Sequence, residues 1–281
     1  MPYKTVLVHV DDSKNCAARL AVAVDLAQRN DAHLIGLFAI SSIPVPGYVA
    51  TEIGPKTLED IENKARRAQA DVAAELFDEM TSGAGLPGVE WRESKLDAVA
   101  AVKLHARYAD LVVVGQPGPD DQSSVNKDFI EHVALGAGRP VVMVPYAGSF
   151  PKIGKNVLIA WNGGREATRA LTDAIPLLRD AEQVRVVVFN PKKNGNGNGN
   201  GRLPGADIGL YLARHGVNVE VSMQSSEDVD VGNQILSRVA DLGIDLVVMG
   251  AYGHSRMREM ILGGVTRTVI ESMTAPVLMS H

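Results

Sequence analysis

ADLVVVGQPG (Ala109–Gly118) and IDLVVMGAYG (Ile244–Gly253) are two segments of one chain that carry the same pattern. Each has an aspartate, four apolar residues and two glycines separated by two residues. A short run rich in valine and leucine is typical of a strand buried on both faces of a parallel sheet. A glycine directly after the strand allows a tight turn or the close approach of another group. The pattern therefore predicts a buried strand followed by a tight loop, twice in one chain.

The rest of the chain is duplicated in the same order, which indicates a duplicated domain rather than chance periodicity. The stretch from 146 to 155 is rich in glycine and proline and lacks periodicity, so the seam falls there. A length of 281 residues suits two domains, and we expect them at residues 1–147 and 152–281. The other matching segments are YKTVLVHVDDS (Tyr3–Ser13) with GKNVLIAWNGG (Gly154–Gly164), and RPVVMVP (Arg139–Pro145) with APVLMSH (Ala275–His281).

Strand-like runs alternate with helical patterns in both halves. In VGNQILSRVADLG, apolar residues recur at helical spacing and Gly243 is a natural C-cap. Such alternation implies right-handed βαβ units and a doubly wound sheet. The predicted fold class is α/β, with two tandem doubly wound (Rossmann-like) domains, each a five-stranded parallel sheet flanked by helices. The last strands, PVVMVP and PVLMSH, would be exposed edges unless they pair with each other across a pseudo-twofold axis.

The halves differ after their second strand. The first half has a long amphipathic helical pattern from 55 to 80, and the second has a run of alternating asparagine and glycine from 194 to 201, followed by a shorter helix. We interpret that run as a surface loop, because no lysine or hydroxyl closes it as a phosphate loop would require. The long helix is predicted to place these residues on one side: Leu58, Ile61, Ala65, Ala68, Val72 and Leu76.

Bulk composition excludes several classes of protein. A net charge of -5 argues against a general nucleic-acid binder, whose affinity rests on neutralising phosphates. The one cysteine, Cys16, excludes a disulfide framework and favours a reducing compartment. No segment reaches the roughly 18 consecutive apolar residues of a membrane span, and the first residues lack the layout of a signal peptide. We therefore expect a cytoplasmic protein that does not associate with membranes.

The residues that carry chemistry follow the first and fourth strands of the second half. Ligands of open α/β sheets bind beyond the carboxyl ends of the strands, where the strand order reverses. There, MGAYGHSRMREMILGGVT has glycines at 250, 253, 263 and 264, and a helix is predicted to begin near Gly264. A helix N-terminus with bare glycines offers free N–H groups and a positive dipole end. Arg256, Arg258 and Arg267 add positive charge, so the segment predicts a phosphate site.

This glycine spacing resembles that of the universal stress protein (UspA) family in its tandem two-domain form. ATP-binding members carry G-x2-G-x9-G followed by Ser or Thr at this location. The resemblance implies a pseudo-dimer of the two halves and an ATP-type ligand, with ATP, ADP and AMP left open. Adenine would lie near the first two strands and the phosphates on the glycine loop. Carried over by position, the nucleotide-binding residues are Ala160, Trp161, Asn162, Met249, Gly250, Gly253, His254, Arg256, Gly263, Gly264, Val265 and Thr266.

Two positions depart from the family pattern. Gly264 stands where Ser or Thr is expected, so one phosphate-binding hydroxyl is absent, although Thr266 is near enough in sequence to supply one. A lost hydrogen bond to a charged group would weaken binding by about 1.5–3 kcal/mol. Asn162 stands where the family has aspartate, so an acceptor is kept but no carboxylate is offered to Mg²⁺. The sequence therefore leaves open whether Mg²⁺ binds together with the nucleotide.

The first half is not expected to bind ATP. It keeps Asp11, Gly115 and Gly118, but SVNKD (Ser124–Asp128) replaces the second glycine pair. The neighbouring carboxylates of Asp120, Asp121 and Asp128 would repel a bound anion. The role of this half would be architectural, or regulatory through another ligand.

The sequence leaves the activity open. His254 and Ser255 are adjacent, but nucleophilic catalysis needs a base oriented by a third group, and no such arrangement is visible. No histidine spacing of a metal site occurs. The favoured reading is a nucleotide-binding stress or signalling protein. A slow ATPase or autokinase on the same site, and a scaffold for an unknown protein partner with a vestigial nucleotide site, remain the alternatives. Whether the whole chain forms a homodimer stays open as well.

Overall fold

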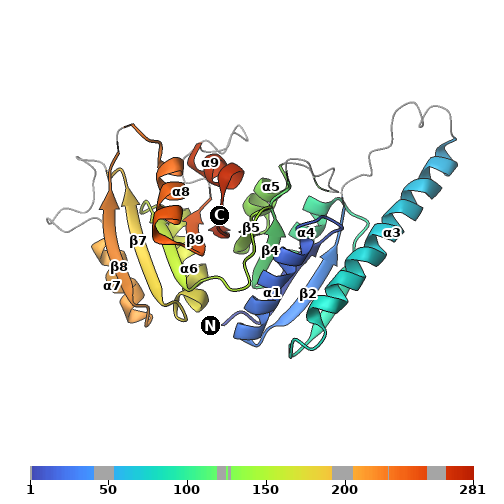
Figure 1. Cartoon of the computed structure of the whole chain (residues 1–281), viewed down its shortest axis with the longest axis horizontal. Coiled ribbons are helices and arrows are strands. Elements are labelled where there is room, and N and C mark those ends of the chain that lie inside the picture. The colour runs from blue at the N-terminus through green and yellow to red at the C-terminus, as the bar shows by residue number, and fades with distance from the viewer. Residues whose placement is uncertain are drawn as a thin grey trace.

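The structure is a computed structural model that describes residues 2–40, 54–118, 125, 128–191, 205–226, 228–251 and 264–281. Within these residues, one sheet of ten strands runs through the whole molecule in the order β3-β2-β1-β4-β5-β10-β9-β6-β7-β8 (Figure 1). The order of the second five strands mirrors that of the first five. The predicted α/β class, with five strands in each half, is therefore confirmed.

The elements alternate along the chain as expected for βαβ units. In the first half they are β1 (Thr5–Val10), α1 (Cys16–Asn30), β2 (His33–Phe38), α3 (Pro55–Thr81), β3 (Val89–Glu93), α4 (Ala98–Ala106), β4 (Leu111–Gly115), α5 (Phe129–Gly136) and β5 (Val141–Val144). In the second half they are β6 (Asn156–Trp161), α6 (Arg165–Leu178), β7 (Gln183–Phe189), α7 (Ala206–Arg214), β8 (Val219–Gln224), α8 (Val231–Leu242), β9 (Leu246–Gly250), α9 (Gly264–Ser272) and β10 (Val277–Ser280).

The two halves join through their last strands. β5 and β10 pair antiparallel, with Val142 opposite Leu278, whereas the other strand pairs are parallel. Both strands are fully buried. The predicted pairing of these two edges is therefore confirmed, and it hides the hydrophobic strand that each half alone would leave at an open edge.

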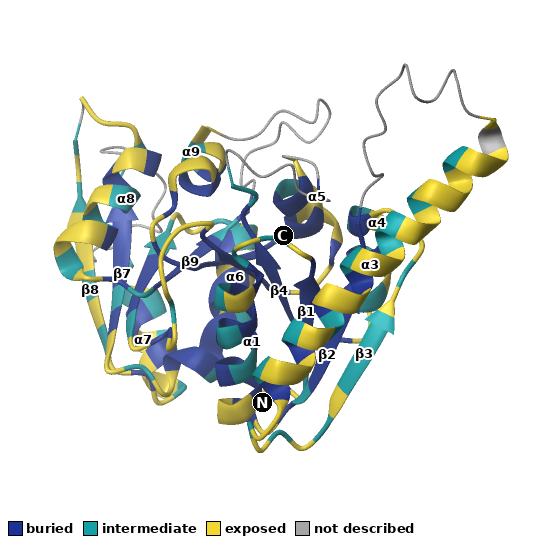
Figure 2. Ribbon diagram, turned by 45° about the vertical axis from the view of Figure 1, so that its right-hand side comes forward, coloured by how far each residue is buried: buried dark blue, intermediate teal, exposed yellow. Residues whose placement is uncertain are grey.

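Helices cover both faces of the sheet and create two cores. On one face, α1, α3, α6 and α7 pack over the strands, and on the other face α4, α5, α8 and α9 do so. Each core contains residues of both halves, and the buried strands form the middle layer in Figure 2. The molecule is therefore a three-layer α/β/α structure whose halves share their hydrophobic interior.

An aspartate holds the start of the first strand in each half. Asp110 accepts hydrogen bonds from the backbone N–H groups of Lys4 and Thr5 at 2.8 and 3.0 Å. Asp245 accepts from the backbone N–H groups of Gly154, Lys155 and Asn156 at 2.8–3.1 Å. These are the aspartates of the repeated segments ADLVVVGQPG and IDLVVMGAYG. The duplication therefore includes these side-chain-to-backbone hydrogen bonds as well as the strands.

Helix α3 forms where predicted, but its buried face is only partly the predicted one. Of the predicted residues, Leu76 packs against the core, whereas Ile61 and Val72 are 47% and 56% exposed. The buried hydrophobic residues of the helix are Ala70, Ala73 and Phe77. The N-terminal turns of α3 extend beyond the sheet at one end of the molecule (Figure 1). The strands set which part of the helix meets the core, and they select a different face from the one with the most regular apolar spacing.

Candidate functional site

The carboxyl ends of β6 and β9 lie next to each other, as the strand-order argument requires. The two strands pair with Ala160 opposite Met249, so the residues that follow them leave the sheet at one edge. Met249 is buried, while Ala160 and Trp161 are half-buried. Asn162 is exposed, and its side-chain oxygen accepts a hydrogen bond from the backbone N–H of Gly164 at 2.8 Å. That contact shapes the turn into α6.

Gly250 is required by the packing of α6. A Cβ atom added to Gly250 would lie 2.4 Å from the backbone nitrogen of Ala167 and 2.5 Å from the carbonyl carbon of Glu166. Real Cβ atoms do not approach backbone so closely, so any larger residue would push the first turn of α6 away. The sequence pattern attributed the bare backbone of Gly250 to a ligand. In the structure, the first turn of α6 already occupies that space.

Helix α9 begins at Gly264, where the sequence predicts it. Gly264 is exposed, and a Cβ atom added to it would meet nothing within 4 Å. Val265 is half-buried, and Thr266 is only 4% exposed. Thr268 donates a hydrogen bond to the carbonyl oxygen of Gly264 at 2.9 Å. The start of α9 thus presents an open N-terminal turn, while Gly253, His254, Arg256 and Gly263 lie outside the described residues.

The same edge of the first half holds a buried ion pair. Asp11 follows β1, and one of its carboxylate oxygens lies 2.6 Å from Nη2 of Arg19 on α1. The backbone N–H and the hydroxyl of Ser13 donate to the same oxygen, at 3.1 and 2.5 Å. Asp11 and Arg19 are 1% and 3% exposed. Ser13 thus binds Asp11, and no side-chain cap is present at Asn15 before α1.

His9 lies beside this ion pair and is held neutral. Its Nε2 lies 2.7 Å from the carbonyl oxygen of Ala39, and its Nδ1 lies 3.7 Å from the Asp11 carboxylate. Burial lowers the pKa of His9 from 6.5 to about 4, and the Arg19 charge acts in the same direction. Burial alone would raise the pKa of Asp11, yet Arg19, His9 and Ser13 hold it well below its usual range. The cluster is therefore an ionised Asp–Arg pair beside an uncharged imidazole.

Arg19 also packs against Gly115, the glycine that ends β4, the fourth strand of the first half. A Cβ atom added to Gly115 would lie 2.5 Å from Nη1 of Arg19. The next residue, Gln116, donates a hydrogen bond to the carbonyl oxygen of Ile270 on α9 at 2.7 Å and accepts one from the backbone N–H of Tyr146. Protein groups therefore fill the edge of the first half at the position that corresponds to the predicted nucleotide site.

The sequence reasoning missed His9 and Arg19, although one signal for them exists. In the repeat alignment, His9, Asp11 and Arg19 correspond to Ala160, Asn162 and Ala170. Ala170 is fully buried. A charged residue such as Arg19 on the buried face of a helix needs a buried partner of opposite charge. Asp11 is that partner, and the second half has the uncharged Asn162 in its place.

Both halves match a known family. The model of the universal stress protein family matches residues 2–145 and again residues 154–281. The chain belongs to the universal stress protein family. It is similar to the universal stress protein Slr1230 of Synechocystis, with 28% identity over 171 residues, which are 60% of this chain and 57% of that protein. It is also similar to the universal stress protein MJ0577 of Methanocaldococcus jannaschii, with 38% identity over 45 residues, or 28% of that protein's length. These matches thus span less than two-thirds of the curated relatives.

Solved structures of universal stress proteins share the fold. A universal stress protein from Archaeoglobus fulgidus superposes with a TM-score of 0.72 at 17% identity, covering 98% of this chain and 95% of that one. A universal stress protein from Pseudomonas aeruginosa superposes with a TM-score of 0.57 at 15% identity, covering 99% of this chain and 93% of that one. At such identities the likeness establishes the tandem architecture and leaves the ligand to be argued from the site.

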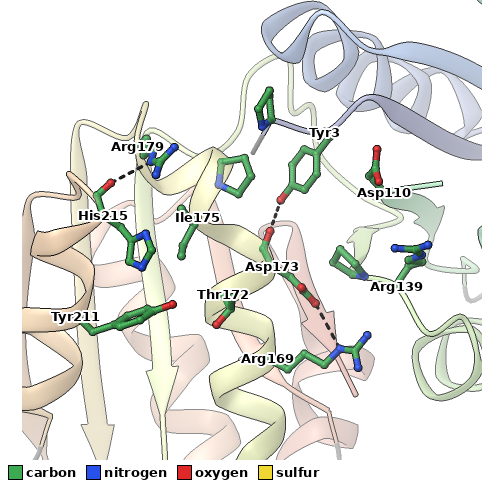
Figure 3. Close-up of a pocket in the computed structure, with 13 residues that line it drawn as sticks. Tyr3, Asp110, Arg139, Arg169, Thr172, Asp173, Ile175, Arg179, Tyr211 and His215 are labelled. Atoms are coloured by element: carbon green, nitrogen blue, oxygen red, sulfur yellow. Dashed lines mark hydrogen bonds and ion pairs between the residues drawn. The ribbon is translucent and has the colours of Figure 1, made fainter.

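A hollow of about 420 Å³ lies at the opposite, amino-terminal edge of this universal stress protein's sheet (Figure 3). Both halves line it. The Tyr3 hydroxyl donates to the carbonyl oxygen of Asp173 at 2.6 Å, and burial raises the pKa of Tyr3. Arg169 donates from Nη2 to the carbonyl oxygen of Gly138, and its Nε lies 3.7 Å from the Asp173 carboxylate. Because these groups already have protein partners, the hollow is a weaker candidate for a ligand site than the edge at β6 and β9.

Two further features of the described residues bear on other functions. None of the described helices is long and apolar enough to span a membrane. Among the same residues, no group of three or more His, Cys, Asp or Glu side chains is arranged to hold a metal ion. Cys16 is buried beside Arg19, and burial raises the pKa of its thiol. A reactive thiolate is therefore not favoured at this position.

Proposed function

We propose that this universal stress protein binds an adenine nucleotide, ATP in the first instance, in its C-terminal domain at residues 152–281. The N-terminal domain at residues 1–147 would support the site without binding a nucleotide. One observation carries the proposal: the two halves share their strand order but differ at the same edge. In the first half this edge is filled by Asp11 and Arg19, whereas in the second it has Asn162 and Ala170.

The open N-terminus of α9 supplies the anion-binding element. The free backbone N–H groups at the start of a helix and its positive dipole end favour phosphate. Gly264 leaves that turn accessible, and nothing lies within 4 Å of where its side chain would be. The glycines and arginine at 253, 256 and 263 fall in the segment that leads into this turn, so they would complete the cradle.

The other end of the nucleotide would lie against the end of β6. Ala160 stands where the first half has a buried histidine, and this smaller side chain precedes the half-buried Trp161. The Asn162 amide keeps hydrogen-bonding capacity for a ribose hydroxyl without adding negative charge near the phosphates. It offers no carboxylate to a metal, so Mg²⁺ would reach the site through the phosphates themselves. Binding would then act as a signal that changes the protein's conformation or partner.

The test is calorimetric titration of the full chain with ATP, ADP and AMP, together with mass spectrometry of any ligand released on heat denaturation. We expect one nucleotide per chain. Gly264→Glu should abolish binding, because its carboxylate would lie at the helix terminus where phosphate binds. The matched control is Gly54→Glu, since Gly54 also precedes a helical turn and also has nothing within 4 Å of an added Cβ atom.

Two results would contradict the proposal. One is wild-type protein that binds none of the three nucleotides. The other is a Gly264→Glu protein that is folded by circular dichroism and binds as tightly as wild type. A stoichiometry of two nucleotides per chain would instead contradict the assignment of a filled site to the N-terminal domain.

A further inference from the structure

Helix α3 carries apolar side chains that no described part of the chain covers. Ile61 and Val72 are 47% and 56% exposed, and Ala68 is exposed as well. The N-terminal turns of the helix project past the sheet in Figure 1 and are coloured mostly as exposed in Figure 2. An isolated exposed apolar residue needs no explanation, but these recur along one line of the helix.

The spacing of these residues is that of a coiled coil. Together with the half-buried Leu58 and Ala65, they follow one another at intervals of three, four, three and four residues, which is the alternation of the a and d positions of a heptad. Their line lies about one-third of a turn around the helix from the buried face formed by Ala70, Ala73 and Phe77, at 100° per residue. We call the line the α3 seam, and it consists of Leu58, Ile61, Ala65, Ala68 and Val72.

We propose that the α3 seam pairs with the α3 seam of a second copy of this chain, as an antiparallel two-helix coiled coil. In the central layers, Ile61 would pack on the partner's Val72, and Ala65 on the partner's Ala68. The contact is isologous, so each layer occurs twice about a twofold axis. The alanines at its centre allow the two helices to approach closely, and the larger residues fill the layers on either side.

The charges beside the seam choose this register. With Ile61 opposite the partner's Val72, Lys64 on one helix comes next to the partner's Asp71, and the pair is repeated by symmetry. Neither Lys64 nor Asp71 makes an ion pair with another described residue of its own chain. Sliding the helices by one heptad to the next antiparallel register would set Lys64 against its own copy. A parallel pairing would set Lys64 beside Gln69 and would give no attractive pair. Opposite charges on flanking positions set orientation and partner choice in coiled coils.

The projection of α3 leaves space for this pairing. The residues of α3 that enter the hydrophobic core begin at Ala70, and the N-terminal turns of the helix project past the sheet (Figure 1). In the antiparallel arrangement the anchored part of one helix meets the projecting part of the other. The seam spans about 20 Å at 1.5 Å per residue. So short a seam predicts a weak dimer that dissociates on dilution.

The test is sedimentation equilibrium of the full chain from low to high micromolar concentration. Wild type should show a monomer–dimer equilibrium. Ile61→Asp should abolish it, because a charge would be buried in a central layer. Lys64→Asp and Asp71→Lys should each weaken dimerisation by roughly tenfold or more, since two attractive pairs become repulsive. An equimolar mixture of these two variants should recover dimerisation, because opposite charges then face each other in both pairs.

The matched control is Arg67→Asp, which makes the same change of charge on an exposed part of α3 turned away from the seam. It should dimerise as wild type does. Circular dichroism must show every variant folded. The proposal is wrong if wild type stays monomeric throughout the range, if Ile61→Asp still dimerises, or if the mixture of the two single-charge variants dimerises no better than either variant alone.

Discussion

At the scale of single residues, one exchange separates the two halves. Arg19 on α1 is buried against Asp11 and Gly115, whereas the corresponding Ala170 on α6 leaves Asn162 without a buried charge to meet. A buried carboxylate needs its cation, because removing one partner of such a pair typically costs about 3–5 kcal/mol. The first half therefore fills this edge with a buried ion pair that the second half lacks.

The position of Gly264 predicts that a substitution there can raise the affinity for nucleotide. Gly264→Ser should tighten nucleotide binding by up to about tenfold, because a hydroxyl would restore the hydrogen bond to phosphate that the family pattern provides. The open space around Gly264 accommodates the added atoms without strain. Calorimetric titration with ATP checks this, with Gly54→Ser as the control that should bind as wild type does. Unchanged or weaker binding by Gly264→Ser would show that phosphate does not lie at this turn.

His9 predicts a pH dependence of stability. In the unfolded chain His9 takes up a proton near pH 6.5, but in the folded protein its pKa is about 4. Protonation therefore favours the unfolded state, so this contribution to stability is complete above pH 6.5 and is lost as the pH falls towards 4. The loss is of the order of 3 kcal/mol.

Urea unfolding across this pH window measures the effect, and His9→Gln is the comparison. A glutamine keeps a donor for the carbonyl oxygen of Ala39 but does not titrate. The free energy of unfolding of His9→Gln should therefore fall less steeply with decreasing pH than that of wild type. Parallel curves for the two proteins would mean that His9 contributes nothing to the pH dependence.

At the scale of elements, α9 is positioned by α8. A Cβ atom added to Gly232 on α8 would lie 2.6 Å from Cβ of Thr268, so the two helices are in close contact there. The position of Gly264, at the start of α9, therefore depends on Gly232, which lies outside the predicted glycine loop. Helix α3 shows the same dependence on context, because packing on the strands, and not the most regular apolar spacing, chooses its buried face.

Gly232→Ala should weaken both stability and nucleotide binding. Overpacking costs about 1–3 kcal/mol, which exceeds the roughly 1 kcal/mol gained from helix propensity. The shift of α9 would also displace its N-terminus. Urea unfolding and ATP titration measure the two effects. Gly209→Ala on α7 is the control, because its Cβ atom would press on Val221 and should lower stability without lowering affinity. If Gly232→Ala binds ATP as wild type does, α8 does not position the site.

At the scale of the whole molecule, the two halves share one continuous sheet. β5 and β10 join them by antiparallel pairing, and both hydrophobic cores contain residues from each half. Gln116, Tyr3 and Arg169 add hydrogen bonds across the seam. The pseudo-twofold arrangement thus places the proposed nucleotide edge of the second half and the edge filled by Asp11 and Arg19 within a single sheet.

This arrangement predicts one unfolding transition for the full chain. Differential scanning calorimetry should give a single heat peak whose calorimetric and van't Hoff enthalpies agree. The reason is that separating the halves would expose the strands β5 and β10 and open both cores. Added ATP should shift this one peak to higher temperature, because binding to the native state stabilises the whole unit. Two resolved peaks, of which only one responds to ATP, would contradict the prediction.

Features that depend on neighbours in the chain could be predicted, and the structure agrees with them. The short apolar runs become the strands, Gly243 caps α8 in the left-handed conformation, and α9 begins at Gly264. The duplication also predicts that the two last strands pair, because each repeat leaves the same hydrophobic edge. The predicted residues of the glycine loop at 253–263 lie outside the described residues and stay predictions.

By itself, the sequence determined the repeat and the alternation of strands and helices, and it predicted one edge of the sheet as the ligand site. These follow from periodic burial and from glycine and capping positions, which are local properties of the chain. Only the tertiary structure decided what fills the space: Arg19 over Gly115, the first turn of α6 over Gly250, and the face of α3 left for a partner. Such contacts join residues far apart in sequence, and their energies depend on the shape of the whole packed interior.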